Sequence, residues 1–253
     1  MADLFDTGET PADAPRPLAD RLRPKKLSEV IGQSQVIGPD APLTVMLEAG
    51  SLGSVVFWGP PGVGKTTIAR LLADETDLHF VQISAIFSGV PELRKVFEAA
   101  KQRRKAGQGT LLFVDEIHRF NKAQQDGFLP HMEDGTILLV GATTENPSFE
   151  LNAALLSRAQ VLVLERLDPV DLDLLAQRAE AELGRELPLD AAARENLLDM
   201  ADGDGRALLN LIEQVMAWTV SDPLDSAALA QRLMKRAAQY DKSGDAHYNL
   251  ISA

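Results

Sequence analysis

Short apolar runs alternate with amphipathic segments over the first two thirds of the chain. The apolar runs are rich in Val, Leu, Ile and Phe, which is typical of strands that are buried on both faces of a sheet. We predict strands at residues 54–58, 79–84, 110–116, 137–141 and 160–164. The segments between them repeat apolar residues at helical spacing, and we predict helices at residues 43–49, 67–73, 91–104 and 121–133. This alternation predicts an α/β fold with a parallel, five-stranded, doubly wound sheet.

The pattern changes at Asp168, after which only helical periods remain, at residues 170–183, 190–200, 206–218 and 226–238. Asp190, Asp204 and Asp225 stand where helix N-caps or first-turn acids are expected. We therefore predict an α/β core at residues 18–167 and a small all-helical lid at residues 168–238. Residues 1–17 are rich in Asp, Ala, Pro and Thr without periodicity, which predicts a disordered leader.

Composition and charge narrow the class of protein. No apolar run approaches the roughly 20 residues of a membrane span, and the start is not that of a signal peptide, so we expect a cytoplasmic protein with no membrane partner. The sequence has no cysteine, which excludes disulfides and thiolate metal sites.

The formal net charge of −12 argues against a surface that binds nucleic acid over its whole area. A DNA contact must then be local. The best candidate is the basic run from Arg94 to Lys105, and a solvated helix face is the alternative.

One stretch carries a specific chemical signal. Residues 59–66 read Gly-Pro-Pro-Gly-Val-Gly-Lys-Thr and match the phosphate-loop pattern G-x-x-x-x-G-K-[ST], between a predicted strand and a predicted helix. The glycines let backbone N–H groups turn toward a polyphosphate, and the helix N-terminus adds partial positive charge. We expect Lys65 to contact the β and γ phosphates of ATP and the Thr66 hydroxyl to bind Mg²⁺. The expected phosphate-binding residues are Gly59, Pro60, Pro61, Gly62, Val63, Gly64, Lys65, Thr66 and Thr67.

Two acids end the predicted strand at residues 110–116. The carboxyl ends of parallel strands meet at one edge of an open α/β sheet, where ligands bind. We therefore expect Asp115 to bind Mg²⁺, directly or through water, and Glu116 to orient or deprotonate the water that attacks the γ-phosphate. His118 follows closely, but without cysteine or a second spaced histidine a metal site lacks partners, so we interpret it as a structural or communication residue. At the end of the next strand, a threonine hydroxyl can help to place the same water, and the candidates are Thr144 and Thr143.

Several segments resemble those of AAA+ ATPases. Residues 27–33 resemble the segment that wraps the adenine base ahead of the core, which implies that Val30, Ile31 and Gly32 line the base pocket. The Thr144 position aligns with the residue called sensor 1.

Two arginines complete this resemblance. The stretch Leu155-Leu156-Ser157-Arg158 resembles the Ser-Arg box of clamp-loader-like subunits, which implies that Arg158 enters the site of a neighbouring subunit as an arginine finger. The turn Gly203-Asp204-Gly205-Arg206 resembles sensor 2, which implies that Arg206 reaches the γ-phosphate. An arginine in an ordinary first helical turn is the alternative for Arg206.

Longer matching strings narrow the family. The run from Asp115 to Lys122, the run from Gln124 to Asp126, the Leu129-Pro130-His131 triplet and the run from Gly141 to Asn152 resemble the replication-associated recombination ATPases (RarA, or MgsA). Their eukaryotic counterpart is the Werner-helicase-interacting ATPase. This resemblance implies DNA-stimulated ATP hydrolysis in replication-fork maintenance, recombination and repair. It further implies action on single-stranded, gapped or forked DNA near single-stranded-DNA-binding protein.

The two ends of the chain carry weaker signals. Residues 240–249 resemble the entry into a further helical domain that the family uses for tetramer formation, so we expect residues 239–253 to start that domain in a C-terminally truncated chain. Near the start of the chain, Leu4 and Phe5 resemble peptides that dock on the replication sliding clamp. The alternative is that this segment is flexible and binds no partner.

Three alternative functions remain open at this stage. A clamp-loader or Holliday-junction branch-migration motor shares the short motifs, although we find no collar or winged-helix domain in the sequence. A nucleotide-switched scaffold for replication proteins would bind ATP without useful turnover. A small-molecule kinase agrees poorly with the helical lid and the Ser-Arg box.

Overall fold

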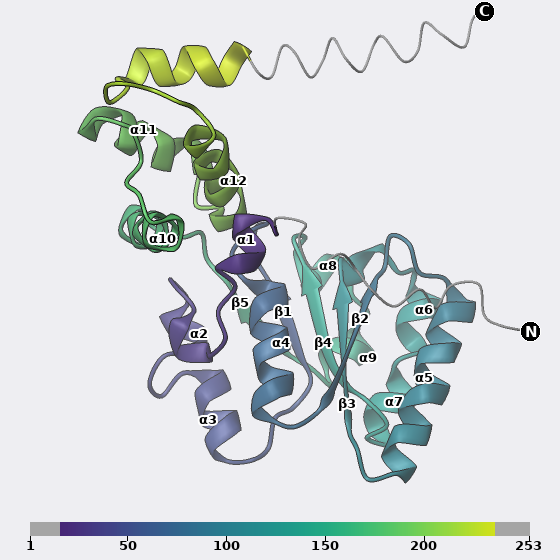
Figure 1. Cartoon of the computed structure of the whole chain (residues 1–253). Coiled ribbons are helices and arrows are strands. Elements are labelled where there is room, and N and C mark those ends of the chain that lie inside the picture. Colours follow the sequence, from purple (N-terminus) through teal and green to yellow (C-terminus); the bar gives the residue numbers. More distant parts are fainter. Residues whose placement is uncertain (1–15, 236–253) are drawn as a thin grey trace, which may run out of the picture.

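The computed structural model describes residues 16–235, which form an α/β body and a neighbouring group of helices (Figure 1). The Leu4-Phe5 hook and residues 239–253 lie outside the described residues. In the part of the chain that is described, we find no helix both long and apolar enough to span a bilayer.

Five parallel strands form one sheet in the order β2-β3-β4-β1-β5. The strands are β1 (Val55–Trp58), β2 (His79–Ser84), β3 (Thr110–Asp115), β4 (Leu138–Thr143) and β5 (Gln160–Val163). At their carboxyl ends, Trp58 pairs with Thr143 on one side and Val163 on the other, and Ser84 pairs with Asp115. The predicted five-stranded, doubly wound α/β fold is confirmed, and its strand ends meet at one edge.

Alternate residues of each central strand enter two separate hydrophobic clusters. In β3, Leu111 and Phe113 pack in the cluster under α4 (Lys65–Glu75), whereas Leu112 and Val114 pack in the cluster under α5 (Val90–Lys105). Figure 1 shows α4 and α5 on opposite sides of the sheet. Because both faces of β1, β3 and β4 are covered, these strands are apolar between their ends and polar chemistry is left to the ends, whereas the outer strands β2 and β5 have exposed positions.

The helix predicted at residues 121–133 is wrong as a single element. The structure has two short helices there, α6 (Lys122–Asp126) and α7 (Leu129–Glu133). Pro130 stands in the first turn of α7, where its missing N–H is tolerated, but a continuous helix would have needed that donor. Phe128 lies between the two helices, is fully buried and makes a T-shaped contact with Phe97 of α5. The break between the helices therefore directs an aromatic side chain into the core.

The sequence does not predict six further short helices. They have four residues or fewer, which is less than two helical turns and too short for apolar residues to recur at helical spacing. These elements are α1 (Leu18–Arg21), η1 (Leu27–Glu29), α2 (Ser34–Ile37), η2 (Ile117–Arg119), α8 (Pro147–Glu150) and α9 (Ala153–Leu156). In contrast, α3 (Pro42–Glu48) lies within one residue of its predicted range.

The second group of helices contains α10 (Pro169–Leu183), α11 (Ala191–Ala201), α12 (Gly205–Met216) and a helix over residues 226–235. Asp190, Asp204 and Asp225 each accept a hydrogen bond from a backbone N–H three residues ahead, as predicted for N-caps. Asp168 caps α10 in the same way. These helices enclose their own hydrophobic cluster, separate from the two clusters of the sheet.

The helix α1 packs on this helical group although its sequence precedes the α/β core. Leu18 is fully buried in the same cluster as α10 and α12, and its backbone N–H donates to Glu213 Oε1 of α12 at 2.6 Å. Arg21 forms an ion pair with Glu182 of α10 at 2.7 Å. The sequence assigns residues 18–22 to the core, whereas in the structure Leu18, Ala19 and Leu22 pack on the hydrophobic cluster of the lid.

We expect Leu18→Ala to lower the free energy of unfolding of this cluster by about 2–5 kcal/mol, because it removes a fully buried side chain. The matched control is Leu174→Ala in α10, where the leucine is 41% exposed and the loss should stay below about 1 kcal/mol. Urea unfolding followed by circular dichroism measures both. Equal losses in the two variants would contradict the docking of α1 on the lid.

Candidate functional site

The loop over residues 59–66 joins β1 to α4 at the carboxyl edge of the sheet. Gly62 and Gly64 have φ angles of +69° and +100°, which side chains rarely allow, and Gly64 is the N-cap of α4. The first helical residue is therefore Lys65, and the free N–H groups of α4 face the loop. Such a helix N-terminus favours an anion.

The ammonium of Lys65 lies inside this loop. Its side chain is largely buried, and Nζ donates to the carbonyl oxygens of Gly59 and Pro60 at 2.7 Å each. Burial lowers the pKa of Lys65, and the carboxylates of Glu116 and Asp115 act in the opposite direction. A partly desolvated cation of this kind gains most from a nearby anion.

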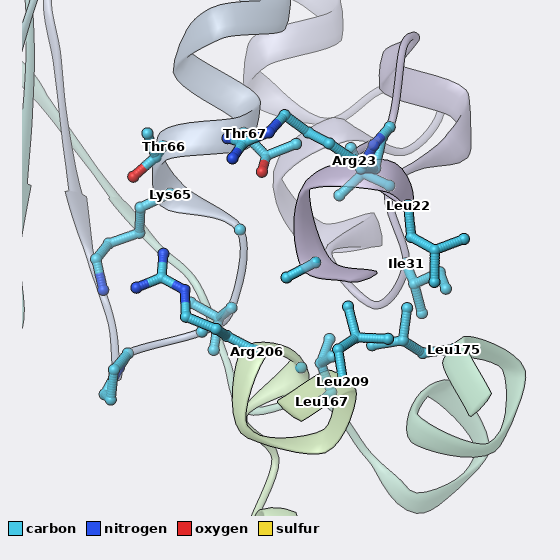
Figure 2. A pocket seen from close by; sticks show the side chains of 18 of the residues that line it. Leu22, Arg23, Ile31, Lys65, Thr66, Thr67, Leu167, Leu175, Arg206 and Leu209 are labelled. Carbon is cyan, nitrogen blue, oxygen red and sulfur yellow. The ribbon is translucent and has the colours of Figure 1, made fainter. Parts of the chain in front are cut away.

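A cavity of about 230 Å³ opens beside Lys65, between the loop and the lid (Figure 2). Most of the predicted site residues line it: Val30, Ile31, Pro61, Gly62, Val63, Gly64, Lys65, Thr66, Thr67, Asp115, Glu116 and Arg206. Gly59 and Pro60 are not lining residues, and they contribute the carbonyls that hold Lys65.

Gly32 also lies outside the cavity lining, contrary to the prediction. Its φ angle is +73°, and a Cβ there would come within 2.3 Å of Asp171 Oδ2 and 2.6 Å of a Leu167 methyl group. Gly32 therefore allows the chain after Ile31 to pass close to Asp171 and Leu167. It supports the cavity lining without being part of it.

The sequence did not reveal the apolar part of the wall. Leu22 of the α1 segment, Leu175 of α10 and Leu209 of α12 face the cavity together with Ile31 (Figure 2). Ala19 and Leu167 add to this apolar wall. No local pattern distinguishes these leucines from core leucines, because they meet only when α1 docks on the lid. An apolar end beside a cationic end suits a ligand with a flat aromatic part and an anionic part.

The sequence did not reveal four further lining residues either. They are Pro24 and the charged residues Arg23, Glu29 and Arg178. Arg178 Nη1 of α10 donates to the carbonyl of Glu29 at 2.6 Å, which ties the lid to the segment ahead of the core.

The two acids lie at the end of β3, on the side of the cavity occupied by Lys65. Glu116 has a left-handed backbone with φ of +52°, an unusual conformation for a residue with a side chain. Its Oε2 lies 3.4 Å from Thr144 Oγ1 and 3.3 Å from His118 Nδ1.

Thr143 is buried, and its hydroxyl contacts His118 and the backbone of Glu145 instead. Of the two candidate threonines, Thr144 is therefore the one that contacts Glu116.

The turn before α12 brings the lid against the phosphate loop. A Cβ on Gly62 would overlap the Asp204 carboxylate, with its nearest oxygen at 1.7 Å. Arg206, in the first turn of α12, lines the cavity and extends toward the side occupied by Lys65 (Figure 2). Its charge lowers the pKa of Lys65 further, after burial. Lys65 of the phosphate loop and Arg206 of the lid thus line the same cavity.

Arg158 does not reach this cavity. Its guanidinium contacts Glu133 of α7, with Nε 2.7 Å from Oε1, and Nη1 donates to the carbonyl of Ala154 at 2.9 Å. The side chain is 38% exposed, so it lies on the surface beyond α9. Any contact of Arg158 with a nucleotide would have to be made in another subunit.

The basic run on α5 is also remote from the cavity lining. Lys101 pairs with Glu98 at 3.0 Å, and Arg104 lies 3.9 Å from Asp134, both as exposed pairs. Exposed pairs of this kind contribute little to stability.

Among residues 16–235, no group of three or more His, Cys, Asp or Glu is arranged around a common metal position. Thr66 and Asp115 nevertheless both line the cavity. One hydroxyl and one carboxylate resemble the small oxygen donor set with which proteins bind Mg²⁺ alongside phosphates and water. The donor set therefore fits a magnesium nucleotide.

Comparison with known families agrees with this geometry. Residues 55–167 match the ATPase family associated with various cellular activities (AAA), and residues 183–253 match the AAA C-terminal domain.

Individual relatives give a finer comparison. The replication-associated recombination protein A of Escherichia coli K12 is 45% identical over 94% of this chain and 56% of its own length. The ATPase WRNIP1 of Dictyostelium discoideum is 37% identical over 94% of this chain and 30% of its own length. The solved Holliday junction branch migration motor RuvB of Thermotoga maritima is 29% identical with a TM-score of 0.66, over 83% of this chain and 71% of that chain. The chain thus spans little more than half the length of the Escherichia coli protein and less than a third of the Dictyostelium discoideum protein.

We expect Gly62→Ala to weaken the affinity for a magnesium ATP analogue by more than about tenfold, because the new Cβ overlaps the Asp204 carboxylate and disturbs the loop. The matched control is Gly50→Ala, since Gly50 has a similar φ of +61° but no atom within 4 Å of its Cβ. Both variants should lose about 1 kcal/mol of stability from backbone strain. Calorimetric titration measures the affinities, and unchanged binding by Gly62→Ala would contradict the assigned role of the loop.

Proposed function

The chain belongs to the AAA ATPases and, within them, to the family of replication-associated recombination protein A, and on this premise we propose that it hydrolyses ATP in response to DNA. The process we propose is the maintenance of replication forks by recombination and repair, and relatives whose names refer to replication-associated recombination support it. The single observation that carries the proposal is that the buried Lys65 lines one cavity together with Asp115 and Glu116, whose charges act on its ammonium.

The apolar end of the cavity would hold the adenine base. Val30 and Ile31 come from the segment ahead of the core, whereas Leu175 and Leu209 come from the lid. The polar end would hold the phosphates, with the N–H groups at the start of α4, Lys65 and Arg206 as donors. Binding would therefore join the loop to the lid across one ligand.

Thr66 and Asp115 would hold Mg²⁺, which when bound neutralises charge on the β and γ phosphates. Glu116 would take a proton from the attacking water, or orient it. Thr144 lies within reach of the Glu116 carboxylate and would help to fix the position of that water. Cations at Lys65 and Arg206 would stabilise the negative charge that the phosphates carry through the reaction.

Arg158 would complete the site of a neighbouring subunit as an arginine finger. Its position on the surface, away from the cavity of its own chain, supports action in trans. The Glu133 pairing would have to open first, and an exposed ion pair is weak enough for that. We therefore propose that the active form is a homo-oligomer.

The proposed partners rest on the resemblance of the sequence to the family, and relatives named for replication-associated recombination support a role at DNA. We propose single-stranded, gapped or forked DNA as the stimulating ligand, and single-stranded-DNA-binding protein and the sliding clamp as protein partners at the fork. Residues 94–105 are the candidate DNA contact because they concentrate positive charge on one helix of an acidic protein. A branch-migration motor is the weaker alternative, since RuvB is 29% identical whereas the bacterial recombination protein is 45% identical.

We expect the chain to release phosphate from ATP, faster with gapped DNA than without. Glu116→Gln should reduce turnover by a factor of about 100 or more at unchanged ATP-analogue affinity, because it removes the proton acceptor. Glu195→Gln on the exposed surface of α11 is the matched control and should retain full turnover. A phosphate-release assay measures the rates. Normal turnover by Glu116→Gln would remove this residue from the catalytic role, and absence of turnover in the parent chain would favour a nucleotide-switched scaffold.

Mixing two inactive variants tests the role of Arg158. Arg158→Ala and Lys65→Ala should each lose nearly all turnover, an arginine finger being worth a factor of about 1,000 or more. An equimolar mixture should recover part of the activity, because a Lys65→Ala subunit still offers Arg158 to an intact site. Turnover per subunit in the parent chain should also rise with protein concentration. A mixture as inactive as its components would argue against sharing of sites.

A further inference from the structure

We propose that His118 is a positioning residue for hydrolysis, which holds the Glu116 carboxylate through a hydrogen bond donated by Nδ1 and links it to the end of β4. This inference rests on the proposed role of Glu116 as the base. His118 does not itself line the cavity, and it contacts the lining residue Glu116, so it would act through Glu116.

The contact is part of a small network at the carboxyl edge of the sheet. His118 Nδ1 lies 3.3 Å from Glu116 Oε2 and 2.9 Å from Thr143 Oγ1. Its side chain is only 6% exposed, so water has little access to replace these partners. Thr143 is the last residue of β4 and is fully buried, which makes its hydroxyl a fixed point.

The neighbouring acceptors favour a proton on Nδ1. The Thr143 hydroxyl is 3.2 Å from the Glu145 carbonyl, which can only accept, and 3.0 Å from the Glu145 N–H, which can only donate. With its own proton directed to that carbonyl, the hydroxyl is an acceptor for His118. A bare Nδ1 would instead face the Glu116 carboxylate with two lone pairs opposed. An Nδ1–H satisfies both neighbours.

The carboxylate needs such support because its backbone is unusual. Glu116 is in the left-handed region, directly after β3, so its side chain is directed by a strained turn rather than by a strand. His118 and Thr144 both contact the same oxygen, Oε2. This arrangement leaves Oε1 as the free oxygen of the carboxylate, and it ties the orientation of Glu116 to two consecutive residues at the end of β4.

The tautomer of His118 gives a test that does not depend on turnover. The chain has four histidines, so long-range ¹H–¹⁵N spectra of the whole chain resolve the imidazoles, and His118→Asn identifies the signal that belongs to His118. In mildly alkaline buffer we expect the proton of His118 on Nδ1, and we expect its signal to move in Glu116→Gln. A His118 protonated only on Nε2 would overturn the proposal.

Kinetics of two substitutions provide the second test. The side-chain amide of His118→Asn can replace Nδ1–H as a donor, whereas that of His118→Gln extends to the region of Nε2. We expect His118→Gln to reduce kcat by a factor of about 10 to 100, with KM and ATP-analogue affinity unchanged, because one hydrogen bond to a charged group is lost. His118→Asn should remain within about threefold of the parent kcat.

A double substitution separates positioning from a general structural effect. In the Glu116→Gln background, His118→Gln should cause no further loss of turnover, because the group it positions is already absent. Equal losses in the Asn and Gln variants, or a loss confined to KM, would overturn the proposal. If the parent chain shows no turnover at all, the proposed function fails, while the tautomer still decides the placement of His118.

Discussion

The site depends on one constraint, which is that the buried ammonium of Lys65 needs oxygen acceptors and opposite charge around it. Both faces of the central strands β1, β3 and β4 are covered by helices, so on these strands polar groups gather at the strand ends. Lys65 is buried there with its ammonium held by two loop carbonyls. Burying a cation is unfavourable unless acceptors and opposite charges surround it, and Asp115 and Glu116 supply the charge. The acids, the lysine and the loop therefore form one electrostatic unit.

The same edge explains why the lid belongs to the site. Gly62 and Asp204 are so close that no side chain fits between them, and Arg206 follows in the next turn of α12. The segment ahead of the core is joined to the lid as well, because Arg178 donates to the carbonyl of Glu29 and α1 packs into the hydrophobic cluster of the lid. A ligand that filled this cavity would touch the loop, the segment ahead of the core and the lid together. Such a ligand would couple its own binding to the position of the lid.

The end of β4 has a second role beside strand pairing. Thr143 pairs with Trp58 in the sheet, holds His118 with its hydroxyl and accepts the N–H of Glu145. Thr144, one residue later, contacts Glu116. Successive residues of one strand end therefore reach the acid loop of the neighbouring strand from two directions. The parallel register of β3 and β4 makes this possible, because it brings both strand ends to the same height.

The sequence by itself determined the parallel sheet, the phosphate loop, the pair of acids and the helical lid with its aspartate caps. Each of these depends on local spacing: apolar runs, glycines at a fixed distance from Lys65, or an acid before a helical period. Only the tertiary structure decided that α1 joins the lid, that residues 121–133 break at Phe128, and that Leu22, Leu175 and Leu209 form one wall. It also decided that Thr144 contacts Glu116 while Thr143 binds His118. The physical reason is that these contacts join residues far apart in the chain, where burial and register, rather than local periodicity, select the partner.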